Sequence, residues 1–250
     1  GGSVGLEGPS IVTGAAIGSN VGRILRLKYK QIILLIGCGS AGVMAAIFNA
    51  PVAALVFALE VIVLNLAMSS IVPLLLASSA ATLTSYFFLE QDVLFHAVEL
   101  FNKGYEILDV PSFVVLGVFT GLVSVYFKRM YIAIEAKFEK IESRKHRLYI
   151  GGGLLGLLLF FFPSLYGEGY EFINMAFRGD YSFLFANSIF VIFEKSFLLT
   201  CVLFCAVILI KVIASSLTFG AGGVGGIFAP SLFIGAIVGL FFWYVFEYFQ

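Results

Sequence analysis

Long apolar stretches, separated by short glycine-rich or charged stretches, make up most of the chain. Apolar residues run almost without interruption through QIILLIGCGSAGVMAAIF and SFLLTCVLFCAVILI. These lengths approach the roughly 20 residues that a helix needs to cross a bilayer. A transmembrane barrel would instead alternate polar and apolar residues over segments of about ten residues. The pattern therefore predicts a helical membrane protein.

Prolines, glycines and charged clusters bound the predicted helices. Pro9 suits a first turn, because the N–H that proline lacks has no acceptor within the helix at that position. Pro51 interrupts the apolar run around it and predicts a break between two short helices. Helices are predicted from residue 9 to the basic cluster at 23–30, over 31–48, 52–68 and 70–88, from 111 to 147, over 151–162 and 190–215, and from Pro230 onwards.

Composition narrows the class of protein. Hydrophobic residues make up 60% of the chain, charged residues make up 12%, and the formal net charge is +0. Such a chain is too apolar for an ordinary soluble domain. Because it has no basic excess, nucleic acid is not expected as a partner. We expect an all-α, polytopic integral membrane protein with broken, tilted helices, lying in membrane lipid of the cell (inner) membrane.

Two glycine-rich stretches each lead into a predicted helix, one at residues 1–9 and the other at residues 219–230. Irregular backbone at membrane depth survives only where protein buries it or where it lines a cavity. The N–H groups at a helix start, with the aligned peptide dipoles behind them, attract anions. We therefore expect backbone amides of residues 5–8 and 226–229 to bind a small anion, weakly enough to release it.

Glu7 stands between Leu6 and Gly8, at the mouth of the first predicted helix. A charged side chain at the bilayer centre costs about 2.5 to 3.5 kcal/mol on insertion scales, so such residues usually have a function. Its carboxylate is itself an anion, and we expect it to occupy the place of the bound ion until protonation or competition expels it. The alternative is a carboxylate that only stabilises the helix dipole.

Three motifs resemble the CLC family of chloride channels and proton-coupled chloride exchangers. GLEGP at residues 5–9 resembles the family motif G-[KR]-E-G-P, FNAP at 48–51 matches the stretch that follows it, and GGIFAP at 225–230 matches G-x-F-x-P. The resemblance implies a homodimer with one anion pathway in each subunit, which is built from inverted repeats. On this view 1–89 is the end of the first repeat, 90–109 is a polar linker and 110–250 is the start of the second.

The resemblance also implies roles for individual residues. Glu7 falls on the gating glutamate of the family, and Phe228 falls on the aromatic residue of the central anion site. The anion-binding positions are Gly5, Leu6, Gly8, Ile227, Phe228 and Ala229. The serine loop and the pore tyrosine of the family have no counterpart in the sequence, so we expect the chain to be part of a longer pore domain. Leu6 replaces the usual lysine or arginine and removes a positive charge from the outer vestibule.

A second departure bears on proton coupling. Family exchangers tend to carry two consecutive glutamates at the end of the stretch that begins with FNAP, and the second serves the inner proton route. Aligned on FNAP, Glu60 takes the first position and Val61 takes the second. Valine carries no proton, which favours a voltage- or pH-gated chloride channel. A proton/chloride antiporter that uses Glu60 after a small helix rotation remains the alternative.

Other functions find less support in the sequence. An intramembrane enzyme would need a motif such as H-E-x-x-H or an activated serine or aspartate, and a structural helix bundle would leave Glu7 unexplained. We expect no enzymatic activity, no metal and no cofactor, with chloride or another small anion as the transported ion. Lys211 lies within the apolar run ILIKVIAS. It could line the pore, or its side chain could snorkel to the membrane surface.

Overall fold

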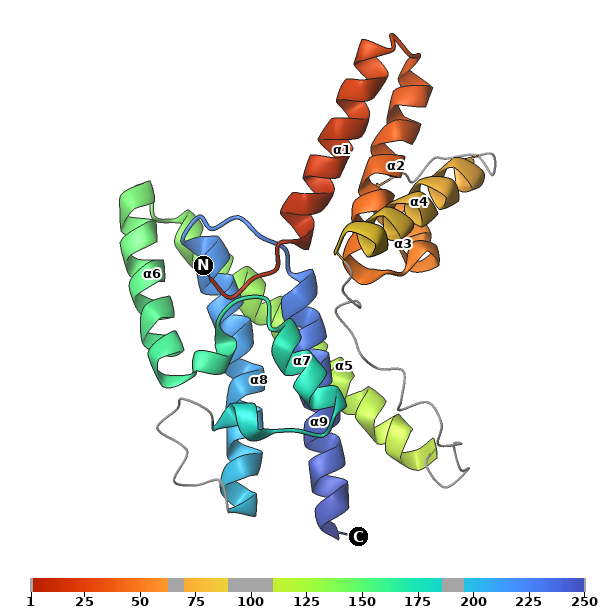
Figure 1. Cartoon of the computed structure of the whole chain (residues 1–250). Helices are drawn as coiled ribbons and strands as arrows, with labels where there is room; N and C mark the ends of the chain where they lie inside the picture. The colour runs from red at the N-terminus through yellow and green to blue at the C-terminus, as the bar shows by residue number, and fades with distance from the viewer. Residues whose placement is uncertain (1, 63–69, 90–109, 186–195, 250) are drawn as a thin grey trace. The chain divides into compact units, whose positions relative to one another are not determined.

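The computed structural model describes residues 2–62, 70–89, 110–185 and 196–249. These residues form helices, turns and one isolated β-bridge, which confirms the predicted all-α class. The described α-helices are α1 (Glu7–Ile24), α2 (Tyr29–Phe48), α3 (Pro51–Phe57), α4 (Ile71–Leu89), α5 (Val110–Glu139), α6 (Arg144–Phe161), α7 (Tyr170–Phe177), α8 (Phe197–Gly220) and α9 (Phe228–Phe249) (Figure 1).

The chain divides into two compact units. One unit is Leu6–His96, and the other joins Gly1–Gly5 to Ala97–Gln250. The predicted linker at 90–109 lies outside the described residues, and the two predicted repeats stay a prediction. The short segment Gly1–Gly5 that precedes α1, called the arm below, therefore belongs to the same unit as α5 to α9.

In the unit Leu6–His96, glycines bring α1 and α2 into close contact. A Cβ on Gly14 would lie 2.5 Å from the carbonyl oxygen of Gly39, and a Cβ on Gly18 would overlap the carbonyl oxygen of Leu35. Small residues at spacings of four allow helix backbones to approach in this way. Pro51 starts α3, as predicted, after Asn49 ends α2 in the left-handed conformation with φ 49°.

The helix that begins at Pro51 changes from α-helical to π-helical hydrogen bonding at its C-terminal end. It continues as a π-helix over Ala58–Ile62. Ala41 of α2, Leu55 of α3, Ala58 and Leu74 of α4 form one buried apolar cluster of this unit. The position of Glu60 is thus set by an irregular turn whose inner side is packed against α2 and α4.

In the other unit, α8 is the central helix. It packs against α5, α6 and α9, and α7 packs against α9. Phe204 and Val212 of α8 and Phe233 of α9 are completely buried. The ring of Phe204 lies 5.6 Å from that of Phe241, and the edge-on ring of Phe172 lies 6.3 Å from that of Phe233. Aromatic contacts therefore hold α7 and α8 against α9.

The prediction of one long helix from 111 to 147 is wrong at its C-terminal end, because α5 stops at Glu139 and α6 begins at Arg144. The Arg147 guanidinium donates to the carbonyl oxygens of Ile141 (2.6 Å) and Glu139 (3.0 Å), and so satisfies acceptors that a continuing helix would have used. Phe138 is buried against Gly151 of α6 and Gly220 of α8. Turning the chain back lets this ring pack on both sides.

The other predicted boundaries need smaller corrections. α1 begins at Glu7 rather than Pro9, and α9 begins at Phe228 rather than Pro230. The segment predicted over 190–215 is α8, which starts at Phe197 and extends to Gly220, while 186–195 lie outside the described residues. The segment predicted over 151–162 is the second part of α6.

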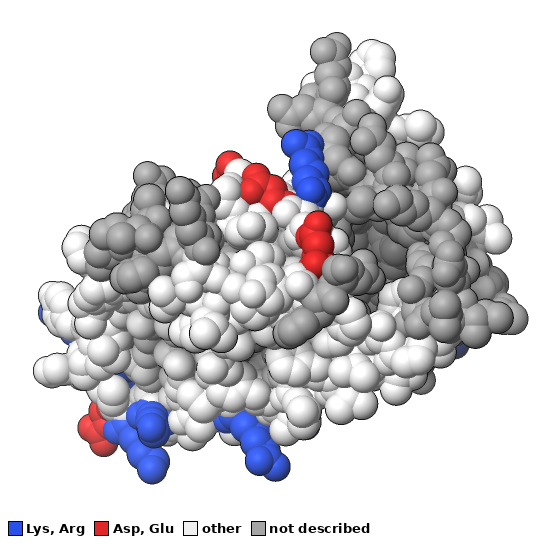
Figure 2. Space-filling view, turned by 90° about the horizontal axis from the view of Figure 1, so that it is seen from below, with Lys and Arg blue, Asp and Glu red and all other residues white. Residues whose placement is uncertain are grey.

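Among the described residues, five helices are long and apolar enough to cross a membrane, by length and composition. They are Tyr29–Phe48, Ile71–Phe88, Val110–Glu139, Phe197–Gly220 and Phe228–Tyr248. Large apolar side chains such as Leu83, Val118 and Leu122 are exposed. Figure 2 shows one face of the molecule, where charged groups cover little of the described surface. Exposed apolar surface of this extent is expected in lipid and costly in water.

Candidate anion-binding site

The arm before α1 is paired with the loop before α9. The N–H of Gly5 donates to the carbonyl oxygen of Gly226 (3.0 Å), and the N–H of Gly226 donates to the carbonyl oxygen of Gly5 (2.8 Å). This antiparallel bridge joins the two glycine-rich stretches. Gly5 precedes Glu7 by two residues, and Gly226 precedes Phe228 by two residues.

Hydroxyl groups hold the rest of the arm in place. Ser3 donates its N–H to Oγ1 of Thr218 (3.2 Å) and its Oγ–H to the carbonyl oxygen of Leu165 (2.6 Å). Oγ of Ser215 donates to the carbonyl oxygen of Ser3 (2.6 Å), and the N–H of Gly167 donates to that of Gly2 (2.8 Å). The backbone groups of Ser3 and Gly5 and the carbonyl oxygen of Gly2 are therefore satisfied inside the protein, as irregular backbone in a membrane requires.

The starts of α1 and α9 share one local arrangement. The carbonyl oxygen of Leu6 accepts from the N–H of Ser10 (3.0 Å), and that of Ile227 accepts from the N–H of Ser231 (3.1 Å). In each helix a proline stands one residue before that serine, so it brings no N–H of its own. Gly8 and Ala229 stand before these serines in the chain, so their N–H groups are among those that have no acceptor within the helix. The two helix starts are therefore alike, and their role in anion binding stays a prediction.

The predicted site residues differ in exposure. Glu7 is 3% exposed and is the first residue of α1, whereas Leu6, its N-cap residue, is 60% exposed. Ala229 is completely buried, and Phe228, the first residue of α9, is 37% exposed. The structure brings together Gly5 and Gly226, whereas the predicted meeting of Glu7 with residues 227–229 stays a prediction. Gly8 follows Glu7 in the chain, and Ile227 precedes Phe228.

The positions predicted for proton transfer lie in the π-helix. Glu60 is exposed there, and the side chain of Val61 lies outside the described residues. π-helical turns occur often at functional sites and displace the side chains that follow them. The proton-route assignment of Glu60 and Val61 stays a prediction.

Lys211 does not snorkel. Its side chain is completely buried, and Nζ donates to the carbonyl oxygens of Leu165 (3.1 Å) and Gly167 (3.2 Å). Nζ also lies 4.7 Å from the ring centroid of Phe233. Two charge-assisted hydrogen bonds offset part of the free-energy cost of burying the ammonium. The cation–π contact offsets a further part, because such a contact contributes about 2 kcal/mol when it is desolvated.

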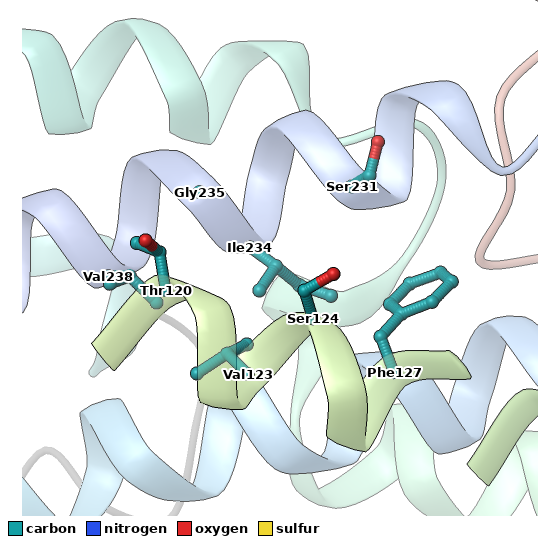
Figure 3. A pocket seen from close by; sticks show the side chains of 8 residues that line it. All are labelled: Thr120, Val123, Ser124, Phe127, Ser231, Ile234, Gly235 and Val238. Carbon is teal, nitrogen blue, oxygen red and sulfur yellow. The ribbon is translucent and has the colours of Figure 1, made fainter. Parts of the chain in front are cut away.

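A separate cavity of about 280 Å³ lies between α5 and α9 (Figure 3). Its lining combines three hydroxyl residues, Thr120, Ser124 and Ser231, with apolar side chains. Thr120 Oγ1 donates to the carbonyl oxygen of Gly117 (2.9 Å), and Ser231 Oγ donates to that of Phe228 (2.6 Å). Because these two hydroxyls donate to their own helices, they do not offer the cavity the donors that an anion needs.

Sequence reasoning missed the hydroxyl groups that hold the arm. Ser3, Ser215 and Thr218 were not singled out, although two of them interrupt an apolar helix in IASSLTFG. Polar groups within a membrane helix commonly bond across to a neighbouring segment, so this short polar run was the available signal.

Comparisons with known proteins agree with the fold and with the motifs. The chain is 31% identical over 245 residues to the voltage-gated ClC-type chloride channel ClcB of Escherichia coli, covering 97% of this chain and 53% of that protein. Its structure resembles that of a slow cyanobacterial Cl⁻/H⁺ antiporter, with a TM-score of 0.78, 24% identity, and coverage of 100% of this chain and 55% of that one. It also resembles a CLC-type fluoride/proton antiporter, with a TM-score of 0.67, 25% identity, and coverage of 93% and 54%.

The chain spans about half the length of the curated relatives it matches, at 53% of each. The sequence profile of the voltage-gated chloride channel family matches residues 1–250, which is the whole chain. The chain therefore belongs to the voltage-gated chloride channel family, the CLC family, whose members are integral membrane transport proteins.

Proposed function

We propose that the chain supplies half of the pore of a chloride channel in the cell (inner) membrane, gated at Glu7. The observation that carries the proposal is the bridge between Gly5 and Gly226, which ties together the glycine-rich segments that lead into α1 and α9. Two helix starts built alike, each with a proline and with small residues beside it, suit the binding of an anion by backbone N–H groups.

Conduction in this proposal depends on weak binding. Amide groups at a helix start carry only a partial positive charge, equivalent to about half an elementary charge, so a chloride bound there can leave again. Amides near Gly8 and Ala229 contribute this field, and Phe228 contributes an apolar wall. An ammonium at the same point would hold the ion more firmly and slow its passage.

Glu7 acts as the gate because its carboxylate competes with the permeating anion for the same donors. Its burial, at 3% exposure, means that the ionised form depends on such donors for stabilisation. Protonation removes the charge and with it the competition, so chloride enters. Gating therefore follows pH, and it follows voltage if chloride is driven against the carboxylate.

We favour a channel because Val61 stands where exchangers of the family carry a proton-transferring glutamate. The second candidate is a proton/chloride antiporter, and it is supported by the likeness to two solved structures that are described as antiporters. In either case we propose a homodimer in lipid, with chloride or a related small anion as the transported ion.

The test is anion efflux from liposomes that contain the full-length protein, measured across pH. We expect acidification to raise the efflux of the unchanged protein, and Glu7→Gln to give high efflux with little dependence on pH. Glu171→Gln is the matched control, because Glu171 is also in the first turn of a helix but is exposed. A Glu7→Gln response that rises with acidification as steeply as the unchanged protein does would contradict the gating role.

A further inference from the structure

We infer that Lys211 is a positioning residue for the proposed anion site and that it acts through the carbonyl oxygen of Leu165. The inference rests on the proposed function, since it concerns the placement of the backbone at Gly5 and Gly226. Neither the family motifs nor their spacing points to Lys211, which lies in the middle of α8.

The first step is the attachment of Lys211 to an irregular turn. Nζ reaches from α8 to the carbonyl oxygens of Leu165 and Gly167, at 3.1 and 3.2 Å. Leu165 ends the short 3₁₀ helix Pro163–Leu165, and Gly167 lies between that helix and α7. The Phe233 ring of α9 covers the ammonium from another side, 4.7 Å from Nζ. The cation therefore joins α8, α9 and this turn at one buried point.

The second step leads from the turn to the arm before α1. The carbonyl oxygen of Leu165, which accepts from Lys211, also accepts from Oγ of Ser3 at 2.6 Å. Gly167, whose carbonyl oxygen accepts from Lys211 at 3.2 Å, donates its N–H to Gly2 at 2.8 Å. Leu165 and Gly167, whose carbonyl oxygens accept from the ammonium, thus each also form a hydrogen bond with the arm.

The third step is the face of α8 that carries these contacts. Lys211, Ser215 and Thr218 follow one another at spacings of four and three, so they lie on one side of the helix. Ser215 donates to the carbonyl oxygen of Ser3 (2.6 Å), and Thr218 accepts from the N–H of Ser3 (3.2 Å). One stripe of α8 therefore holds Ser3 from two directions directly and from a third through Leu165.

The last step runs along the arm itself. Gly5 is two residues from Ser3, and both of its backbone polar groups bond to Gly226. A chain of two residues has little freedom to absorb a displacement, because each residue spans at most about 3.6 Å. Lys211 thus sets the position of Ser3, and Ser3 sets the position at which Gly5 meets Gly226.

The experiment measures chloride efflux at graded chloride concentrations in liposomes containing the full-length protein, for Lys211→Met, Lys211→Arg, Ser3→Ala and the pair Lys211→Met with Ser3→Ala. We expect Lys211→Met to raise the chloride concentration at half-maximal flux about tenfold, the scale of one lost charge-assisted hydrogen bond. Lys211→Arg should restore most of the affinity, since it keeps a cation. Lys145→Met, at an exposed lysine of α6, is the control and should change nothing.

Two further readings decide whether the role is one of positioning. If Lys211 and Ser3 act through the same carbonyl oxygen, the paired variant should shift the half-maximal concentration no more than the larger single change. Shifts that multiply would overturn the inference, and so would a folded Lys211→Met protein with unchanged half-maximal concentration. If Lys211→Met does not fold, Ser3→Ala alone must still raise that concentration for the inference to stand.

Failure of this inference differs from failure of the proposed function. Unchanged affinity in the Lys211 and Ser3 variants, together with a pH response that Glu7→Gln abolishes, would overturn only the role of Lys211. A full-length protein that moves no anion would instead overturn the proposed function, and the positioning role would fall with it.

Discussion

The side chain of Val4 occupies the space that a Cβ on Gly225 would need. An alanine at residue 225 would overlap Cγ2 of Val4 and would approach the carbonyl oxygen of Gly5 to 3.1 Å. That carbonyl oxygen is one of the two acceptors in the bridge between Gly5 and Gly226. Residue 225 is therefore glycine because the arm lies directly against it.

Gly225→Ala should push the arm away from the loop before α9. We expect chloride efflux to fall by about tenfold or more, because small displacements of binding groups are costly in affinity. Gly239→Ala is the matched control, since a Cβ there would meet no atom within 4 Å. Equal efflux in the two variants would contradict the proposed importance of the bridge.

Leu6→Arg should strengthen the attraction of anions. Leu6 is exposed, and the family motif carries a lysine or arginine at this position. We expect the variant to increase efflux several-fold at low ionic strength, because a cation near the entrance raises the local concentration of anions. The increase should vanish in about 1 M inert salt, where the screening length falls to about 3 Å. Leu6→Met should behave like the unchanged protein at every salt concentration.

Gly18→Ala should destabilise the pair of helices α1 and α2, because the new methyl group would overlap the carbonyl oxygen of Leu35. Overpacking of this kind typically costs about 1 to 3 kcal/mol. Gly156→Ala in α6, where a Cβ meets no atom within 4 Å, should instead be neutral or stabilising by up to about 1 kcal/mol. Thermal unfolding in detergent measures both changes, and equal unfolding temperatures for the two variants would contradict the close approach.

Proton coupling separates the two proposed mechanisms. A channel should not move protons uphill when a chloride gradient is imposed on liposomes that contain the full-length protein. We therefore expect the internal pH to stay constant, with a protonophore as the control that the vesicles report pH changes. A fixed ratio of protons to chloride ions would show an antiporter, and Val61→Glu should then change that ratio little.

The hydrophobic pattern was sufficient to predict the helical class and the position of most helices. The break at Pro51 and the apolar segment ending at Phe48 are both observed. These features are local, because they depend on chain composition and on the conformational limits of proline. The two glycine-rich stretches were also predicted to have irregular backbone, and they are joined by the bridge between Gly5 and Gly226.

The predictions that failed depend on contacts between segments far apart in the chain. The end of α5 at Glu139 follows from the packing of Phe138 against Gly151 and Gly220, which no local pattern contains. For Lys211 the sequence left two alternatives open, and the exclusion of snorkelling likewise depends on carbonyl groups of a turn more than forty residues earlier. In both cases tertiary contacts decide what the local sequence does not.

The length of α5 has a consequence for the surface of the protein outside the bilayer. Residues 110–127 contain no charge and measure 18 × 1.5 Å, about 27 Å, which nearly equals the hydrocarbon thickness of about 30 Å. The remaining 12 of its 30 residues, from Lys128 to Glu139, continue for about 18 Å more. Because Phe138 is buried against α6 and α8, this last part of α5 runs along the protein rather than standing free. Its exposed Lys137 should be labelled by water-soluble amine reagents that are added to intact vesicles on that side.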